Sequence, residues 1–322
     1  MMMFCLHESL KTERTDRMKA FFVFSGQGAQ TVGMGRDLFE SSAAARKVFE
    51  EADEVLGYKL SDIIFNGPIE KLTESIYCQD AIYTTSCAAY AAFTEKFGKI
   101  TPVACAGLSL GEYGALYCAG AFDFATGAKL LAARGKLMDE ACRATVGAMA
   151  SVLGGDLEVI KAVCKEIDID VANYNCPGQV VISGEKSKVE AAVAELKARG
   201  LRKVIMLNVA GAFHSRLMKS AGAGLASVLE QADICVPAVP VYHNFTADKA
   251  ASVEELKSNL VNQVAGSVRW EDCVRRAVAD GADTVIEFGP GAVLTGLVRR
   301  TASDLKLVNI NSAASLESAV LE

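Results

Sequence analysis

The sequence holds only three histidines in 322 residues, so few side chains could serve as a neutral general base near pH 7. Basic residues are also outnumbered: 33 Lys and Arg stand against 39 Asp and Glu, for a net charge of −6. Such a chain is a poor binder of phosphate backbones, so we expect no nucleic-acid partner. No apolar run reaches the roughly 18 residues that span a bilayer, so we expect no membrane partner either.

Cysteine is plentiful, but the ten cysteines form no C-x-x-C pair and no Cys/His spacing typical of zinc. Most stand in apolar runs, as Cys87, Cys105 and Cys118 do. This pattern predicts buried, reduced thiols in a cytoplasmic protein with no metal site. Residues 1–18 are charged and lack the apolar centre of a secretory signal. We expect this leader to be poorly ordered, with Met18 as an alternative start.

The most informative segment is Gly-Leu-Ser-Leu-Gly at residues 107–111. It follows an apolar, strand-like run at 102–106 and precedes a helix-like run at 115–122. A G-x-S-x-G between a strand and a helix is typical of a nucleophile elbow. The turn exposes the serine hydroxyl at a helix N-terminus, where backbone N–H groups and the helix dipole stabilise an oxyanion. We therefore predict acyl transfer through an ester of Ser109.

Strand-like and helix-like segments alternate along the chain, which predicts an α/β fold with a mostly parallel sheet. We expect an α/β-hydrolase-like large domain formed by residues 19–146 and 209–322. Between these parts, residues 147–208 have the order β-α-β-β-α-β, which is that of an inserted ferredoxin-like small domain. The expected strands of the large domain are residues 19–25, 102–106, 239–243, 284–288 and 307–310.

A serine nucleophile needs a base, and the only histidines are His7, His214 and His243. His7 lies in the charged leader and is a poor candidate. His243 ends a predicted strand, where a lone histidine more often has a structural role. His214 lies in a loop just after the small domain, and loops on a rigid scaffold often carry catalytic residues. Taken alone, His214 is explained equally well by structure and by catalysis.

Two other features have both an ordinary and a functional interpretation. The glycine loop at residues 26–30 is not a dinucleotide fingerprint, because Thr31 replaces the third glycine, and it is not a P-loop. It is an ordinary strand-to-helix turn or one half of an oxyanion hole. Arg134 lies in a predicted helix at 125–141. It is either a solvated charge or a bidentate partner for a substrate carboxylate.

Together these segments resemble the malonyl-CoA:acyl carrier protein transacylases over residues 19–310. Each motif is moderately specific, but the whole set in this order is highly specific. The motifs are FVFSGQGAQ at 22–30, GLSLGEY at 107–113, RGKLM at 134–138, NYNCPGQVVISG at 173–184, AFHS at 212–215, and Gln263 ahead of VRW at 268–270.

The resemblance implies a reaction and a set of partners. Malonyl would pass from malonyl-CoA, a substrate and not a cofactor, to Ser109. It would then pass to the phosphopantetheine thiol of holo acyl carrier protein. His214 would be the base, and Arg134 would bind the free malonyl carboxylate.

Four further roles are implied in the same way. The backbone N–H groups of Gln27 and Leu110 would form the oxyanion hole. Gln263 would orient His214 in place of the aspartate of a full triad. Phe213, next to the base, would crowd a methyl branch on the substrate, so that malonyl would be preferred over methylmalonyl.

The chain departs from the family pattern at three positions. Leu108 stands where many members have histidine, Ser25 where proline is frequent, and Gly211 where some members have a bulkier residue. Two other interpretations compete with the resemblance. One is a patatin-like serine lipase or esterase that uses Ser109 and Asp280, from the segment Asp-Gly-Ala at 280–282. The other is a carrier-protein docking module without catalysis.

Overall fold

The computed structural model describes residues 18–321, and it has a mixed α/β fold with two separate four-stranded sheets. The predicted leader lies outside the described residues, except for Met18, which packs against the core. None of the helices in residues 18–321 is both long and apolar enough to cross a bilayer. Within the same residues, no His, Cys, Asp and Glu side chains gather in a group that could hold a metal ion.

The first sheet is parallel and has the strand order β2-β1-β7-β8. Its strands are β1 (Ala20–Phe24), β2 (Ala104–Gly107), β7 (Thr284–Phe288) and β8 (Lys306–Ile310). The first three are buried along their whole length, as expected for a parallel sheet that is covered on both faces. Alternate residues of β1 enter different apolar cores: Phe22 and Phe24 pack in one, Phe21 and Val23 in the other.

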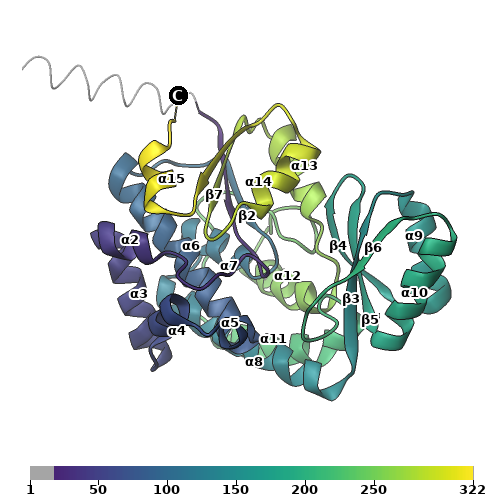
Figure 1. Cartoon of the computed structure of the whole chain (residues 1–322). Helices are drawn as coiled ribbons and strands as arrows, with labels where there is room; N and C mark the ends of the chain where they lie inside the picture. Colours follow the sequence, from purple (N-terminus) through teal and green to yellow (C-terminus); the bar gives the residue numbers. More distant parts are fainter. Residues whose placement is uncertain (1–17, 322) are drawn as a thin grey trace, which may run out of the picture.

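Helices cover both faces of this sheet (Figure 1). Those of the first part of the chain are α2 (Arg36–Ser41), α3 (Ala43–Leu56), α4 (Leu60–Asn66), α5 (Ile69–Thr73), α6 (Ser75–Phe97), α7 (Gly111–Cys118) and α8 (Phe124–Ala144). Those of the second part are η1 (Arg216–Met218), α11 (Lys219–Gln231), α12 (Val253–Ala265), α13 (Trp270–Ala279), α14 (Val293–Thr301) and α15 (Ala313–Ser318). Buried along most of its length, α6 is a central part of the larger core.

The second sheet is antiparallel and has the order β4-β5-β3-β6. Its strands are β3 (Gly147–Leu153), β4 (Asp170–Cys176), β5 (Gln179–Glu185) and β6 (Lys203–Met206), and its helices are α9 (Leu157–Ile167) and α10 (Lys186–Ala198). These elements share an apolar core of their own and stand together at one end of the molecule in Figure 1. The strand β4 lies at the edge of this sheet, and its outer side contacts the large part of the chain through an isolated bridge between Asn173 and Val268.

Tight backbone contacts join the end of β2 to the end of β1. A Cβ added to Gly111 would lie 2.2 Å from the carbonyl oxygen of Phe24, and one added to Gly26 would lie 2.5 Å from that of Leu108. Only glycine fits at such approaches. These contacts place the loops that follow β1 and β2 against each other at the carboxyl edge of the sheet. The helix α7 begins at Gly111, earlier than the predicted 115.

The predicted strand at 239–243 is wrong in extent. Only Val241 forms a bridge, parallel to Cys105 of β2. Pro237 and Pro240 have no N–H to donate, so a continuous ladder cannot form there. The segment still follows β2 through two backbone hydrogen bonds and so brings residues 243 and 244 to the carboxyl end of that strand.

The contact between Gly111 and Phe24 gives a stability prediction. We expect Gly111→Ala to lower the free energy of unfolding by about 1–3 kcal/mol, because the new methyl group must displace backbone. Gly296→Ala is the matched control: it lies in α14, it is exposed, and no heavy atom comes within 4 Å of its added Cβ. That variant should gain up to about 1 kcal/mol from helix propensity. Urea denaturation of both variants measures the difference, and equal stabilities would contradict the packing.

Candidate active site

The nucleophile elbow is built around a strained serine. Ser109 follows β2, precedes α7 and has a positive φ of 55°, a backbone region that a non-glycine residue enters only where its surroundings hold it there. The fully buried Asn244 side chain provides that restraint at both ends of the turn. Its Oδ1 accepts from the Ser109 N–H at 2.6 Å, and its Nδ2 donates to the Gly107 carbonyl at 2.8 Å.

His214 lies against the serine hydroxyl. Its Nε2 is 2.8 Å from Ser109 Oγ, and its Nδ1 is 2.8 Å from the backbone carbonyl oxygen of Gln263. A carbonyl can only accept, so Nδ1 carries the hydrogen and Nε2 is left to accept from the hydroxyl. Like Ser109, His214 has a positive φ, here 54°.

The surroundings of His214 favour the neutral imidazole. Burial and, second, the nearby Arg134 guanidinium lower the pKa of His214 to about 4, against the opposing effect of backbone acceptors at Gln263 and Gly266. The imidazole is therefore neutral and able to accept a proton at pH 7.

Arg134 lies in α8 and is only 1% exposed. Its NH1 donates to Gln79 Oε1 at 2.5 Å, and its NH2 donates both to Ser109 Oγ and to Gln263 Oε1 at 3.0 Å. In the described part of the chain no carboxylate forms an ion pair with it, and burial lowers its pKa. The structure thus keeps a buried positive charge beside the serine without a direct counter-ion, which is an arrangement suited to an anionic substrate.

The buried carboxylate of Glu112 connects Ser109, His214 and Arg134 indirectly, through the residues that hydrogen-bond to it. Glu112, in the first turn of α7, accepts from the Asn244 backbone N–H and from Gln263 Nε2 with Oε2, each at 2.8 Å, and Oε1 lies 2.7 Å from His243 Nδ1. Gln263 Nε2 also donates to the Ser109 carbonyl at 3.0 Å. The amide of Gln263 therefore stands between the Glu112 carboxylate and the Arg134 guanidinium, and its backbone carbonyl orients His214.

The remaining predicted residues have different surroundings. Leu110 is the N-cap of α7 and is buried, whereas Gln27 is partly exposed in the loop after β1. Within residues 18–321, neither of their backbone N–H groups has a hydrogen-bond acceptor. Phe213 is 5% exposed and belongs to the larger core. Asp280 accepts from Tyr242 OH at 2.5 Å and is not a partner of Ser109 Oγ, whose contacts are His214 and Arg134.

The three departures from the family pattern have structural counterparts. Leu108 packs at the edge of the smaller core of the parallel sheet. The Ser25 hydroxyl donates to the Pro290 carbonyl at 3.1 Å, which ties the ends of β1 and β7 together. At Gly211 an added Cβ would lie 2.3 Å from Cys142 Sγ, so a bulkier residue there requires a smaller neighbour than Cys142.

Sequence reasoning gave no role to Gln79, Glu112 or Asn244. Glu112 lies inside the predicted GLSLGEY segment, and its position three residues after the serine was the one available signal. Asn244 comes directly after the segment 239–243, which was expected to be a plain strand. Gln79 is one polar residue in a long buried helix, and such a residue needs a partner, but its sequence position does not say which one.

A strained serine that hydrogen-bonds a neutral histidine at the carboxyl edge of a parallel sheet defines an acyl-transfer enzyme with a serine nucleophile. The sequence pattern described as the acyl transferase domain matches residues 21–319, and the chain belongs to this family.

Within the family, the similarity is to malonyl transferases. The malonyl CoA-acyl carrier protein transacylase of Bacillus subtilis (strain 168) is 42% identical over 307 residues, which cover 94% of this chain and 96% of that protein. The structure of acyl-carrier-protein-S-malonyltransferase from Bartonella henselae has a TM-score of 0.89 and 38% identity, with 94% and 98% coverage. A malonyl-transacylase solved with a type II PKS acyl-carrier protein has a TM-score of 0.90 and 40% identity, with 94% and 98% coverage. The resemblance predicted from the motifs is confirmed.

The low pKa of His214 gives a pH prediction. If His214 is the base for Ser109, attack requires the neutral imidazole, and the rate of Ser109 acylation should stay level as the pH falls from 8 to about 5. It should then drop with an apparent pKa of about 4. Brief pH-jump single-turnover measurements would show this limb before acid unfolding intervenes. An acid limb near the ordinary histidine value of about 6.5 would mean that the imidazole is not desolvated in this way.

Proposed function

We propose that this chain transfers a malonyl group from malonyl-CoA to the phosphopantetheine thiol of holo acyl carrier protein, through a malonyl ester of Ser109. One observation carries the proposal: Ser109 Oγ lies 2.8 Å from His214 Nε2 and 3.0 Å from NH2 of Arg134, a buried side chain with no ion-pair partner within residues 18–321. The first contact suits a nucleophile and its base. The second suits an acyl group that carries a carboxylate. The similarity to named malonyl CoA-acyl carrier protein transacylases supports the same substrates.

In the first half-reaction, His214 Nε2 takes the proton of Ser109 as Oγ attacks the thioester carbonyl carbon. The oxygen of the tetrahedral intermediate becomes negative and accepts from the backbone N–H groups of Gln27 and Leu110. These groups suit that role because neither has an acceptor in the part of the chain that the structure describes, and the two loops that carry them are in contact. The C–S bond then breaks, and the imidazolium gives its proton to the coenzyme A sulfur.

The second half-reaction is the reverse with a new thiol. The phosphopantetheine thiol gives its proton to His214, and its sulfur attacks the ester carbonyl carbon. The same oxyanion site holds the intermediate, and the C–O bond breaks. Ser109 regains its proton from His214, so the enzyme returns to its starting state with no cofactor and no metal taking part.

Arg134 selects the acyl group in this proposal. A malonyl ester on Oγ has its free carboxylate only a few bonds away, within reach of a guanidinium that already touches Oγ. Burying that carboxylate without a partner costs several kcal/mol, and two charge-assisted hydrogen bonds offset this cost. Phe213, next to His214, is the candidate for excluding a methyl-branched acyl group.

We further propose the domain division 19–146 with 209–322, and 147–208. The separate apolar core of the antiparallel sheet supports it. The strand order of that sheet and its two helices support a ferredoxin-like unit, and the elbow after a parallel strand supports an α/β-hydrolase-like large domain. The cysteines of residues 18–321 are free thiols, which supports a cytoplasmic location.

Intact-mass spectrometry tests the proposed reaction directly. Malonyl-CoA should add one malonyl group to the wild type and none to Ser109→Ala, and holo acyl carrier protein should then remove it. Apo carrier protein, which lacks the thiol, should leave the adduct in place. An adduct on Ser109→Ala, or none on the wild type, would refute the proposal. Turnover of short nitrophenyl esters in water without any thiol acceptor would favour an esterase.

A second prediction concerns the acyl group. In Arg134→Ala a malonyl group loses its charged partner, while an acetyl group, having no carboxylate, loses none. The loss of a buried charge pair costs about 2–5 kcal/mol, so the malonyl-to-acetyl ratio of kcat/KM should fall by roughly 30- to 5000-fold. Competition between malonyl-CoA and acetyl-CoA measures this ratio. An unchanged ratio would make Arg134 a structural charge only.

A further inference from the structure

His214 lies in a segment that leaves the antiparallel sheet and has little regular structure of its own. The chain runs from β6 through residues 207–215 to η1, and His214 has a positive φ of 54°. Local bonds are few: Ser215 Oγ donates to the Ala212 carbonyl at 2.6 Å and accepts from Leu217 N–H at 3.3 Å. Something outside this segment must therefore hold the imidazole at its short distance from Ser109.

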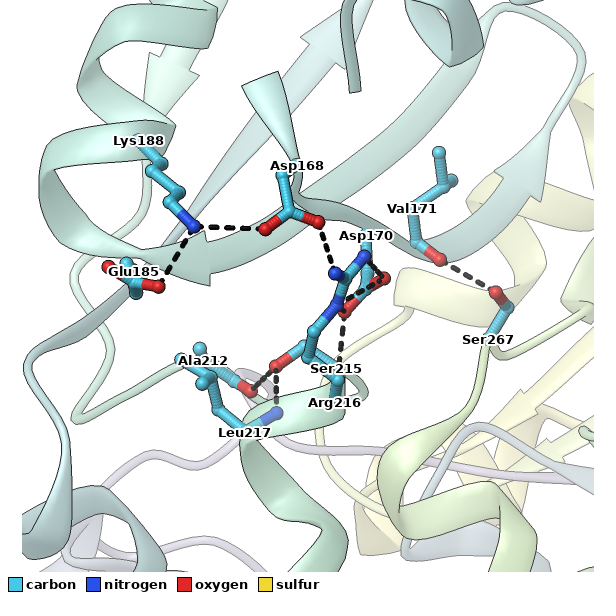
Figure 2. Close-up of polar contacts among 10 residues, drawn as sticks. All are labelled: Asp168, Asp170, Val171, Glu185, Lys188, Ala212, Ser215, Arg216, Leu217 and Ser267. Atoms are coloured by element: carbon cyan, nitrogen blue, oxygen red, sulfur yellow. Dashed lines mark hydrogen bonds and ion pairs between the residues drawn. The ribbon is translucent and has the colours of Figure 1, made fainter. Parts of the chain in front are cut away.

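The edge strand β4 supplies one such contact just after the histidine. The backbone N–H of Arg216 donates to Asp170 Oδ2 at 2.8 Å, and its guanidinium donates to both oxygens of the same carboxylate. The guanidinium also pairs with Asp168, which in turn pairs with Lys188. Figure 2 shows Arg216 reaching from η1 to these two aspartates, with Ser215 and Ala212 directly beneath.

The same strand holds the segment that orients the imidazole. Gln263, near the end of α12, supplies the acceptor for His214 Nδ1. Directly after that helix, Ser267 Oγ donates to the Val171 carbonyl at 2.7 Å, as Figure 2 also shows. The Val268 N–H donates to Ala172 and the Tyr174 N–H donates to Val268, both at 2.8 Å. Consecutive residues of β4 therefore contact the segment of the base and the segment of its acceptor.

We propose that β4 is the positioning element for the catalytic histidine, and that Asp170 is its key residue. Asp170 fixes the backbone two residues after His214, while residues 171–174 fix the chain at positions 267 and 268, just beyond the end of the helix that carries Gln263. The distance between His214 Nδ1 and the Gln263 carbonyl is then set by one strand of the small sheet. This inference rests on the proposed role of His214, and it adds to that role the part of the molecule that keeps the hydrogen on Nδ1.

The backbone contact, and not the charge, should carry the effect. Arg216 and Asp168 are about half exposed, and exposed ion pairs contribute little because solvent screens them. Asp168 and Asp170 both pair with the Arg216 guanidinium, but only Asp170 also accepts from a backbone N–H. The two aspartates thus form a matched pair for separating charge from position.

The experiment compares Asp170→Ala, Asp170→Asn and Asp168→Asn in the full chain. In Asp170→Ala we expect kcat for malonyl transfer to fall by roughly 10- to 100-fold with KM within about two-fold, because misplacement of a catalytic group by about 1 Å has effects of this size. Asp170→Asn keeps an acceptor for the N–H and should recover most of this loss. Asp168→Asn removes a neighbouring charge and should leave kcat within about two-fold.

A second readout separates positioning from general loss of stability. ¹⁵N NMR of the histidine rings, with His214 assigned from His214→Gln, reports which ring nitrogen carries the hydrogen. The wild type and Asp170→Asn should show a single Nδ1–H form, and folded Asp170→Ala a mixture of the two tautomers. If Asp170→Ala does not fold, Asp170→Glu replaces it: the longer side chain keeps the ion pair but moves the acceptor, so kcat should still fall.

Three results would overturn the inference: wild-type kcat and tautomer in Asp170→Ala, an equal loss in Asp168→Asn, or wild-type kcat in the substitute Asp170→Glu. The NMR measurement needs no substrate. A wild type that transfers no malonyl but shows the expected tautomers would therefore refute the proposed reaction and leave the positioning role of β4 supported.

Discussion

The site depends on the hydrogen bonds made by one fully buried carboxylate, that of Glu112. Burying a carboxylate is costly unless its oxygens are satisfied, and here Asn244, Gln263 and His243 satisfy them. Two of these three partners also contact the residues around Ser109. Asn244 holds the strained turn of Ser109, and Gln263 reaches Arg134 with its side chain and His214 with its carbonyl. The carboxylate also balances the buried guanidinium through the Gln263 amide, and among the described residues Arg134 has no direct counter-ion.

Local patterns were enough to predict the parallel sheet, the elbow and the histidine loop. A strand, a glycine-flanked serine and a helix are consecutive in sequence, so their geometry follows from the backbone. Gln79, Glu112 and Asn244 escaped prediction because their contacts join residues far apart in the chain. The Glu112–Asn244 and Arg134–Gln79 contacts span 132 and 55 positions. Glutamate and asparagine are ordinary surface residues by type, and nothing local marks them as buried.

The fold decides two points that the sequence left open. A helix arginine is usually solvated, yet Arg134 is 1% exposed, because α8 packs closely against α6 and places the guanidinium beside Gln79. Gln263 was expected to orient the base, and its backbone carbonyl is the group in contact while its side chain bridges three other groups. The sequence identified the residue, but only the course of α12 decides which of its atoms meets the imidazole.

A carbonyl behind the histidine, in place of a carboxylate, suits exchange between thiols and a serine. An anionic partner would raise the pKa of the imidazole and would repel an anionic acyl group, whereas a carbonyl fixes the same tautomer with no charge. With His214 as the proposed base, the imidazolium that forms is a strong acid, because burial and the nearby Arg134 lower the pKa of His214 to about 4. A departing thiolate, whose thiol has an ordinary pKa of about 8.5, takes the proton of this imidazolium readily. An imidazole with so low a pKa is a weak base for deprotonating Ser109. In the proposed reaction, the Arg134 N–H that donates to Oγ helps to stabilise the negative charge that develops on this oxygen. In the proposed reaction, base strength lost at His214 is thus offset by the same buried guanidinium that we propose as the partner of the substrate carboxylate.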